Sequence, residues 1–325
     1  MLFRSGKGSL AAWLVAHGHL EPGVWERWAK LSGDAPELPG YELLKRLGEG
    51  GTAVVFLARR ASGLEVALKV ARPEVAADPA ARENFVQEGL LLGRLRHPGI
   101  VRARKLARAG QTLYLELDHL PGETALDRIL AGRLFGEQEA LGVALQVARA
   151  LEYLAGQGVV HRDVKPGNIM LGPRGEATLL DLGFAASAAG RESGREDTGG
   201  TLHYMAPEQA LGEEVDQRAD IYALGLSLFH MVTGALPGNR SDPRQAMRER
   251  IRHQLSSLAL KERAFTPLLA YFVQKMTARE REIRYQDHAE LIRDLEEKCA
   301  GFKEIREEGR VERRPPLRRR RRRRS

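Results

Sequence analysis

The feature that most constrains the fold is a change in the hydrophobic pattern of the chain at about residue 120. Residues 41–117 hold short apolar runs separated by glycine turns, a pattern typical of β-strands, with one helical pattern at about 80–95. From about 123 to 300 the pattern is mostly helical, with long amphipathic or apolar stretches at 137–155 and 220–233. The sequence therefore predicts an α+β fold with two lobes: a small β-rich lobe with one helix, and a larger, mostly helical lobe, with a cleft between them.

Composition excludes several classes of protein. A hydrophobic fraction of 43% is that of a globular protein and not of a disordered chain. A single cysteine, Cys299, excludes an internal disulfide framework, so the reducing cytoplasm is the expected location. There is no apolar run of about 18 residues or more, so no transmembrane segment is expected.

The positive charge of the chain is confined to one end. The formal net charge is +8, yet residues 310–325 alone hold ten arginines and one glutamate, which leaves 41 basic and 42 acidic residues elsewhere. Seven consecutive arginines at 318–324 predict a basic, disordered tail over 301–325. Two interpretations of residues 310–325 stay open: salt-dependent contact with a polyanion such as nucleic acid or anionic lipid, or a solvated and functionally neutral end.

A glycine cluster lies between the first two expected strands, in Leu47-Gly48-Glu49-Gly50-Gly51-Thr52-Ala53. Glycine turns let backbone N–H groups approach phosphates closely, but a plain hairpin explains the cluster equally well. Lys69 lies in an apolar strand, where an ammonium group needs a partner. Glu88, in the helical pattern that follows, is the candidate partner, and a lysine that reaches solvent from a strand edge is the alternative.

The decisive motifs lie in an irregular stretch, residues 159–210. They are His161-Arg162-Asp163-Val164-Lys165-Pro166-Gly167-Asn168, Asp181-Leu182-Gly183 and Ala206-Pro207-Glu208. With the glycine cluster, Lys69 and Glu88 they form the ordered motif set of the eukaryotic-type (Hanks-type) serine/threonine protein kinases. The chain from 41 to about 297 resembles that family, and the segment 204–209 resembles its bacterial branch.

The resemblance implies transfer of the γ-phosphoryl group of Mg-ATP, with Mn²⁺ as a second candidate metal, to serine or threonine hydroxyls of protein substrates. It implies that Asp163 accepts the hydroxyl proton, that Lys165 lies by the γ-phosphate and that Thr201 contacts both. Asn168 and Asp181 are the implied metal ligands. Lys69, paired with Glu88, is implied to hold the α- and β-phosphates.

The same resemblance implies the residues around the nucleotide. Leu117 corresponds to the residue at the back of the adenine pocket, and the backbone of Asp118 and Leu120 to the groups that meet the adenine edge. The implied ATP-binding set is Leu47, Gly48, Glu49, Gly50, Gly51, Thr52, Ala53, Val55, Ala67, Lys69, Leu117, Asp118, Leu120 and Met170. Two positions depart from the family pattern, Ala53 for the third glycine and Leu182 for the usual phenylalanine, and we expect an active enzyme despite both.

Supporting and regulatory positions follow from the resemblance as well. Asp220 is implied to hold the backbone of His161 and Arg162, Arg284 to form a buried ion pair with Glu208, and Leu182 and Gly183 to follow the metal-binding aspartate. Arg162 before the catalytic aspartate is linked to a phosphorylated activation segment, for which Ser193 and Thr198 are the preferred candidates. Carboxylates at 192, 196 or 197 are the alternative source of that negative charge.

We expect three parts of the chain: an N-terminal helical extension at 1–40, a kinase domain at 41–300 and the tail at 301–325. The domain divides into an N-lobe at 41–117, a hinge at 118–122 and a C-lobe at 123–300. The extension contains all three tryptophans. Two interpretations stay open: it packs on the kinase body, or it docks a partner protein or a second copy of the chain. Docking of a second copy would form a homodimer. The rival hypotheses are a nucleotide-binding pseudokinase scaffold that acts through its two ends, and a module tethered to nucleic acid or a membrane.

Overall fold

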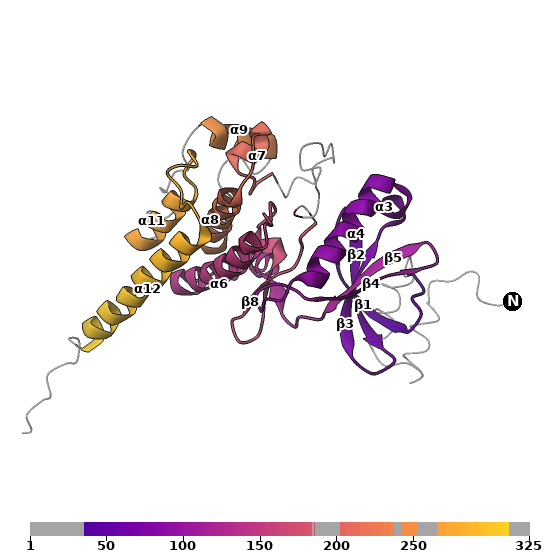
Figure 1. Cartoon of the computed structure of the whole chain (residues 1–325). Helices are drawn as coiled ribbons and strands as arrows, with labels where there is room; N and C mark the ends of the chain where they lie inside the picture. Colours follow the sequence, from indigo (N-terminus) through magenta and orange to yellow (C-terminus); the bar gives the residue numbers. More distant parts are fainter. Residues whose placement is uncertain (1–35, 184, 186–201, 237–241, 253–264, 312–325) are drawn as a thin grey trace, which may run out of the picture. The chain divides into compact units, whose positions relative to one another are not determined.

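The computed structural model describes residues 36–183, 185, 202–236, 242–252 and 265–311. The chain divides into two compact units, residues 1–123 with 170–198, and residues 124–169 with 199–325. Figure 1 follows both units along the sequence by colour. The expected N-terminal helices, all three tryptophans and the run of seven arginines lie outside the described residues.

The first unit is built on an antiparallel five-stranded sheet with the strand order β1-β2-β3-β5-β4 (Figure 1). The strands are β1 (Tyr41–Glu49), β2 (Ala53–Arg60), β3 (Glu65–Ala71), β4 (Ala103–Ala109) and β5 (Thr112–Asp118). Two helices follow β3, α3 (Pro73–Ala77) and α4 (Pro79–Arg94). The side chain of Asp78 caps α4 by accepting the N–H of Ala81 at 2.7 Å. The β-rich unit with one long helix is thus confirmed, and α3 is an addition to it.

The two faces of β3 have different tasks because successive side chains of a strand point to opposite faces. Val66, Leu68 and Val70 lie in the buried apolar cluster that also contains Phe56 and Tyr114. Lys69 alternates with them and so points to the other face, where its ammonium reaches α4. The alternation of the sequence therefore places one charged group beside α4 and leaves an apolar core on the other face of the sheet.

One expected strand lies elsewhere. The sequence predicts a strand around Val101, but β4 begins at Ala103. The chain after α4 first pairs with β8 (Ala177–Leu179): Ile100 forms a parallel bridge with Leu179, and the N–H of Val101 donates to its carbonyl at 2.8 Å. β8 is a neighbour of the short β7 (Ile169–Leu171), and neither strand was expected from the sequence.

The second unit is helical, as expected. Its helices are α5 (Ala125–Leu130), α6 (Glu137–Gly156), α7 (Pro207–Leu211), α8 (Gln217–Thr233), α9 (Pro243–Arg252), α11 (Pro267–Met276) and α12 (His288–Val311), with a 3₁₀ turn, η1 (Pro166–Asn168), and the two-residue β6 (Glu123–Thr124) at its start. Every residue of α8 from Ala219 to Thr233 is buried, because α6 and α11 both pack against it. Gly225 permits that packing: a Cβ there would lie 2.7 Å from the Cβ of Met276.

The C-terminal boundary differs from the expectation. The expected division between domain and disordered tail at residue 300 falls inside α12, which continues to Val311. Residues 301–311 are therefore helical and not disordered, because helix-forming lysine, glutamate and arginine carry the turns of α12 past residue 300. The rest of the tail lies outside the described residues.

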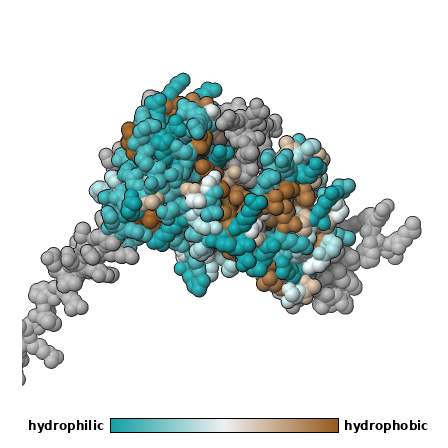
Figure 2. Space-filling view, in the orientation of Figure 1, coloured by the Kyte–Doolittle hydropathy of each residue, from teal (hydrophilic) through white to brown (hydrophobic). Residues whose placement is uncertain are grey.

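The described helices include none that is both long and apolar enough to cross a membrane. The most apolar of the long helices, α8, is a core element. On the face of the molecule drawn in Figure 2 hydrophilic residues predominate, and hydrophobic residues form smaller separate areas. This distribution matches a chain whose apolar residues are gathered in the two cores.

Candidate functional site

The glycine turn closes the hairpin of β1 and β2. Gly48 pairs with Val55 across the hairpin, and the N–H of Gly50 donates to the carbonyl of Ala53 at 2.9 Å. Arg72, at the end of β3, holds this turn from the side: its Nε donates to the carbonyl of Gly50 at 2.9 Å and its guanidinium forms an ion pair with Glu49. The alanine in place of the third glycine opens β2 and is buried, so the turn accommodates its methyl group.

A charge cluster around the buried ammonium group of Lys69 lies in the same unit. Nζ of Lys69 lies 2.5 Å from Oε1 of Glu88 and 3.2 Å from Oδ1 of Asp181, so one ammonium group binds two carboxylates. Burial alone would raise the pKa of Asp181, but Lys69 and the N–H of Gly183 hold it well below its ordinary value. Burial alone would lower the pKa of Lys69, and the two carboxylates raise it instead. Burial and the neighbouring Asp181 raise the pKa of Glu88 to about 7, against the opposing effect of Lys69. Lys69 and Asp181 are therefore charged at neutral pH.

The residues implied to surround the adenine lie on β2, β3 and β5, in the segment after β5 and on β7. Ala67 pairs with Leu117 across β3 and β5, and both are buried. Val55, Asp118, Leu120 and Met170 are half-buried. β5 ends at Asp118, where the expected hinge begins.

Gly122 gives the end of the hinge its shape. Its φ is +142°, and a Cβ there would collide with the carbonyl oxygen of Leu171. No other residue fits so close to that backbone. The sequence places Gly122 at the end of the expected hinge, and a glycine after a proline is a turn signal, but the close approach to Leu171 cannot be read from it.

The second unit carries the loop 161–168, whose side chains converge on Asp163. Nζ of Lys165 donates to both carboxylate oxygens of Asp163, at 2.9 and 2.7 Å. Nδ2 of Asn168 donates to the carbonyl of Asp163 and to its Oδ2, both at 2.9 Å. Asp163 itself is only 8% exposed. The loop thus fixes one carboxylate between a cation and an amide, an arrangement that suits orientation of a hydroxyl group.

The backbone of this loop is strained at Arg162 and is held there from both sides. Arg162 is the only described residue other than glycine with a positive φ, 66°. Asp220 on α8 accepts the N–H of His161 at 2.8 Å and the N–H of Arg162 at 2.7 Å. Nε2 of Gln209 donates to the carbonyl of Arg162 at 3.1 Å. Burial raises the pKa of Asp220 to about 7, while the two N–H groups favour its ionised form.

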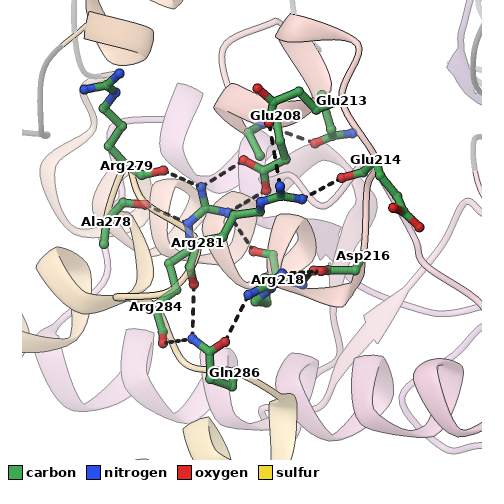
Figure 3. Close-up of polar contacts among 12 residues, drawn as sticks. Glu208, Glu213, Glu214, Asp216, Arg218, Ala278, Arg279, Arg281, Arg284 and Gln286 are labelled. Atoms are coloured by element: carbon green, nitrogen blue, oxygen red, sulfur yellow. Dashed lines mark hydrogen bonds and ion pairs between the residues drawn. The ribbon is translucent and has the colours of Figure 1, made fainter.

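A buried arginine ties α7 to the segment before α12 (Figure 3). Nη1 and Nη2 of Arg284 lie 2.6 and 2.9 Å from the two carboxylate oxygens of Glu208, and both residues are almost fully buried. Arg284 also donates to the carbonyls of Ala278, Arg279 and Arg218. The guanidinium is saturated with partners, so it fixes α7 to the start of α8 and to the segment after α11.

The donor chemistry of two other residues suits a divalent metal ion. Both bonds of Asn168 within the loop use its amide nitrogen, which leaves its amide oxygen as a ligand. The side chain of Asp181 is 40% exposed, and its contacts with Lys69 and with the N–H of Gly183 both use Oδ1. Amide and carboxylate oxygens are the ligands that Mg²⁺ and Mn²⁺ take in proteins. The two residues belong to different units.

Some predicted residues lie outside the described part of the chain, namely Thr201, Ser193 and Thr198. Two other contacts have no signal in the sequence. The buried Arg250 on α9 donates to the carbonyl of Leu202 at 2.7 Å, and the hydroxyl of Tyr204 lies 2.6 Å from Nδ1 of His230. A charged residue in the amphipathic pattern of a helix gives no signal that it is buried, so only the structure identifies these contacts.

Comparison with known proteins shows which family has these residues. A family model described as protein kinase domain matches residues 41–299. The serine/threonine-protein kinase PknB of Mycolicibacterium smegmatis is 32% identical over 263 residues, which are 78% of this chain and 42% of that protein. PknB of Mycobacterium leprae is 32% identical over 262 residues, with the same shares. The chain thus spans about two fifths of the length of these relatives.

A solved structure gives the same result for the fold. The kinase domain of Mycobacterium tuberculosis PknI, crystallised as a cysteine-to-alanine mutant, matches with a TM-score of 0.62 and 28% identity. The match covers 81% of this chain and 97% of that structure.

Proposed function

The chain belongs to the protein kinase domain family, and from that premise we propose that it transfers the γ-phosphoryl group of ATP to serine and threonine hydroxyls of protein substrates. The observation that carries the proposal is the geometry around Asp163, whose carboxylate is bound by Lys165 and Asn168. The serine/threonine-protein kinases named above are relatives, which supports the choice of acceptor. Both halves of the required machinery, a phosphate-binding cluster and a carboxylate for the acceptor, are present in the chain.

The reaction uses these residues as follows. The acceptor hydroxyl oxygen bonds to the γ-phosphorus, and the bond from that phosphorus to the β–γ bridging oxygen breaks, so that ADP leaves. The carboxylate of Asp163 orients the hydroxyl and accepts its proton. Lys165, held on Asp163, supplies positive charge for the phosphoryl oxygens, while Lys69 binds the α- and β-phosphates and is positioned by Glu88.

A divalent cation supplies charge neutralisation for the phosphate oxygens when it is bound. We assign Asn168 and Asp181 as its ligands, on the donor chemistry given above. Mg²⁺ is the proposed ion, and Mn²⁺ is the second candidate because it takes the same oxygen ligands. The glycine turn, with Gly50 and its neighbours, contributes backbone N–H groups to the phosphates.

The test is transfer of labelled γ-phosphate to a general protein acceptor, followed by identification of the phosphorylated amino acid. The proposal predicts label on serine or threonine that depends on a divalent cation. A chain that binds nucleotide but labels no acceptor in any of several proteins, and not itself, would be a pseudokinase scaffold instead. Label on tyrosine alone would contradict the choice of acceptor.

Regulation by phosphorylation of the activation segment is part of the proposal. Nε of Arg162 is buried and has no hydrogen-bond partner among the described residues, as expected of a cation that awaits a negative charge. Ser193 and Thr198 are the proposed acceptors. Phosphopeptide mapping after incubation with Mg-ATP should find phosphate on one of them, and an unmodified segment in an active enzyme would contradict this part.

Two further proposals concern the ends of the chain and rest on sequence alone. Residues 310–325 contact a polyanion, nucleic acid or anionic lipid, and removal of these residues should abolish binding of labelled nucleic acid at low salt. Residues 1–40 contribute to a homodimer, so a chain that begins at Gly40 should keep its activity and lose self-association. Unchanged nucleic-acid binding without residues 310–325 would contradict the first proposal. Unchanged self-association without residues 1–40 would contradict the second.

A further inference from the structure

A hollow of about 600 Å³ lies in the first unit, between the second half of α4 and the edge strand β4. Its lining residues come from the end of β2, from α4, from the connection after α4 and from β4. They are Arg60, Gly89, Leu90, Gly93, Arg94, Arg96, Arg102, Ala103, Arg104, Lys105 and Leu106. None of these residues belongs to the machinery proposed for phosphoryl transfer.

Two glycines of α4 create the space. Gly89 and Gly93 are four residues apart and so lie on one face of the helix. Gly89 lets α4 approach β4, since a Cβ there would lie 3.1 Å from Cδ1 of Leu106. At Gly93 a Cβ would meet no atom within 4 Å, so this position is open space. The hollow therefore exists because α4 lacks side chains at two positions of its second half.

The charge of the lining has one sign. Six of its members are arginine or lysine, and none is acidic. Two of the six are neutralised: Arg60 binds the buried Glu116, with Nε 3.0 Å from Oε2, and Arg104 forms an ion pair with Asp118. Arg96 is held by the end of α4, because it donates to the carbonyls of Gly93 at 2.8 Å and Leu95 at 2.6 Å.

The other three basic residues are Arg94, Arg102 and Lys105, which are exposed and have no acidic partner among the described residues. Positive charge on an edge strand also prevents pairing with other strands, and that explains Arg102 and Lys105 in part. It does not explain the arginines that α4 and its following loop contribute to the opposite wall. Uncompensated cations around a concave surface with apolar patches, here Leu90 and Leu106, are what an anionic ligand requires.

We propose that this hollow is a binding pocket for a phosphoryl group on a protein segment, a phosphoserine or phosphothreonine with an apolar neighbour. Guanidinium groups bind a phosphate dianion with paired, charge-assisted hydrogen bonds, and several of them around one pocket favour phosphate over a single carboxylate. The exposed Leu90 and the half-buried Leu106 offer contact for the apolar neighbour. The pocket stands on α4 beside Glu88, yet binding there does not require phosphoryl transfer, so its test is independent of the proposed function.

The experiment is a titration of the full chain at low salt with a labelled short peptide that contains phosphoserine followed by leucine. The full chain should bind it, and the variant with both Arg94→Gln and Arg102→Gln should bind at least about tenfold more weakly, since each charge-assisted bond contributes roughly that factor. Gly93→Leu, which fills the open space, should have a similar effect. Arg108→Gln is the matched control: this exposed arginine lies on β4 but outside the lining and should leave binding unchanged.

Three results would overturn the proposal. The first is equal binding by the full chain and by the folded double variant, which would place the peptide elsewhere. The second is equal affinity for the same peptide with glutamate in place of phosphoserine, which would indicate an acidic segment. The third is displacement of the peptide by inorganic phosphate at a concentration equal to that of the peptide, which would make free phosphate the ligand. Thermal unfolding of each variant verifies that it is folded. If Gly93→Leu does not fold, Gly93→Ala replaces it in the binding experiment.

Discussion

The carboxylate of Asp220 accepts the N–H of Arg162 at 2.7 Å, at the one described residue other than glycine whose backbone is left-handed. The left-handed conformation costs about 1–3 kcal/mol and persists only where neighbouring groups enforce it. Asp220 on the N–H side and Gln209 on the carbonyl side are those groups. Through this residue, α7 and α8 set the direction in which the loop presents Asp163.

Asp220→Asn should therefore loosen the loop. The amide can accept only with its oxygen, so one buried N–H, of His161 or Arg162, loses its partner, and we expect the free energy of unfolding to fall by about 1–3 kcal/mol. The rate of phosphoryl transfer should fall by more than the loss of folded protein accounts for, because Asp163 loses its orientation. Asp216→Asn is the control, since Asp216 caps the same helix without touching the loop. If the two variants lose activity equally, Asp220 has no positioning role.

The pair of Arg284 and Glu208 should be costly to break. Both side chains are almost fully buried, so Glu208→Gln leaves an uncompensated guanidinium and should lower the free energy of unfolding by about 3–5 kcal/mol. Glu280→Gln removes a member of the exposed pair with Arg279 and should cost no more than about 1 kcal/mol. Denaturant titration measures both. Similar small losses in both variants would show that the buried pair does not anchor α7.

Arg72 should contribute to the binding of ATP and not to the stability of the fold. Its side chain is 32% exposed and holds the glycine turn through Gly50 and Glu49. Arg72→Ala should raise the KM for ATP by about threefold to tenfold, equivalent to roughly 1 kcal/mol, because the turn must then be ordered by the nucleotide itself. Arg59, an exposed arginine on the same sheet with its own ion pairs, is the control for alanine substitution. An unchanged KM in both variants would remove Arg72 from the site.

His288 should make the protein sensitive to acid. Burial lowers the pKa of this histidine to about 4, and neither ring nitrogen has a hydrogen-bond partner among the described residues. Between about pH 6.5 and 4 the unfolded chain binds a proton that the folded chain does not, so stability present at pH 7.5 is lost as the pH falls. The expected loss between pH 7.5 and 5 is about 2 kcal/mol.

The measurement is the free energy of unfolding by denaturant at the two pH values, for wild type and for His288→Leu. The leucine variant should show a pH dependence smaller by about 2 kcal/mol. An equal pH dependence in the two proteins would mean that other groups dominate the acid response.

Much of the fold could be predicted from the sequence, because short apolar runs between turns mark the strands from Tyr41 to Asp118, helical periodicity marks α6, and a long apolar run marks α8. The residues of the site could be predicted by resemblance, since each motif residue has a fixed role in the family. The sequence could not predict contacts made by residues without a motif. Arg72, Gln209 and Arg250 look like ordinary surface residues until the chain is folded, and the basic hollow depends on two glycines that leave a gap in an otherwise regular helix. The end of α12 was missed because charged residues fit both a helix and a disordered tail.

The proposed role of Asp163 is to accept the proton of the substrate hydroxyl, and the rate of phosphoryl transfer by Asp163→Asn at saturating Mg-ATP tests that role. This variant should bind ATP as wild type does, because Lys69, Glu88 and Asp181 are untouched. Its rate of transfer should fall by about 100-fold or more, the usual contribution of a general base. A rate within a few-fold of wild type, with ATP binding unchanged, would show that Asp163 does not accept this proton.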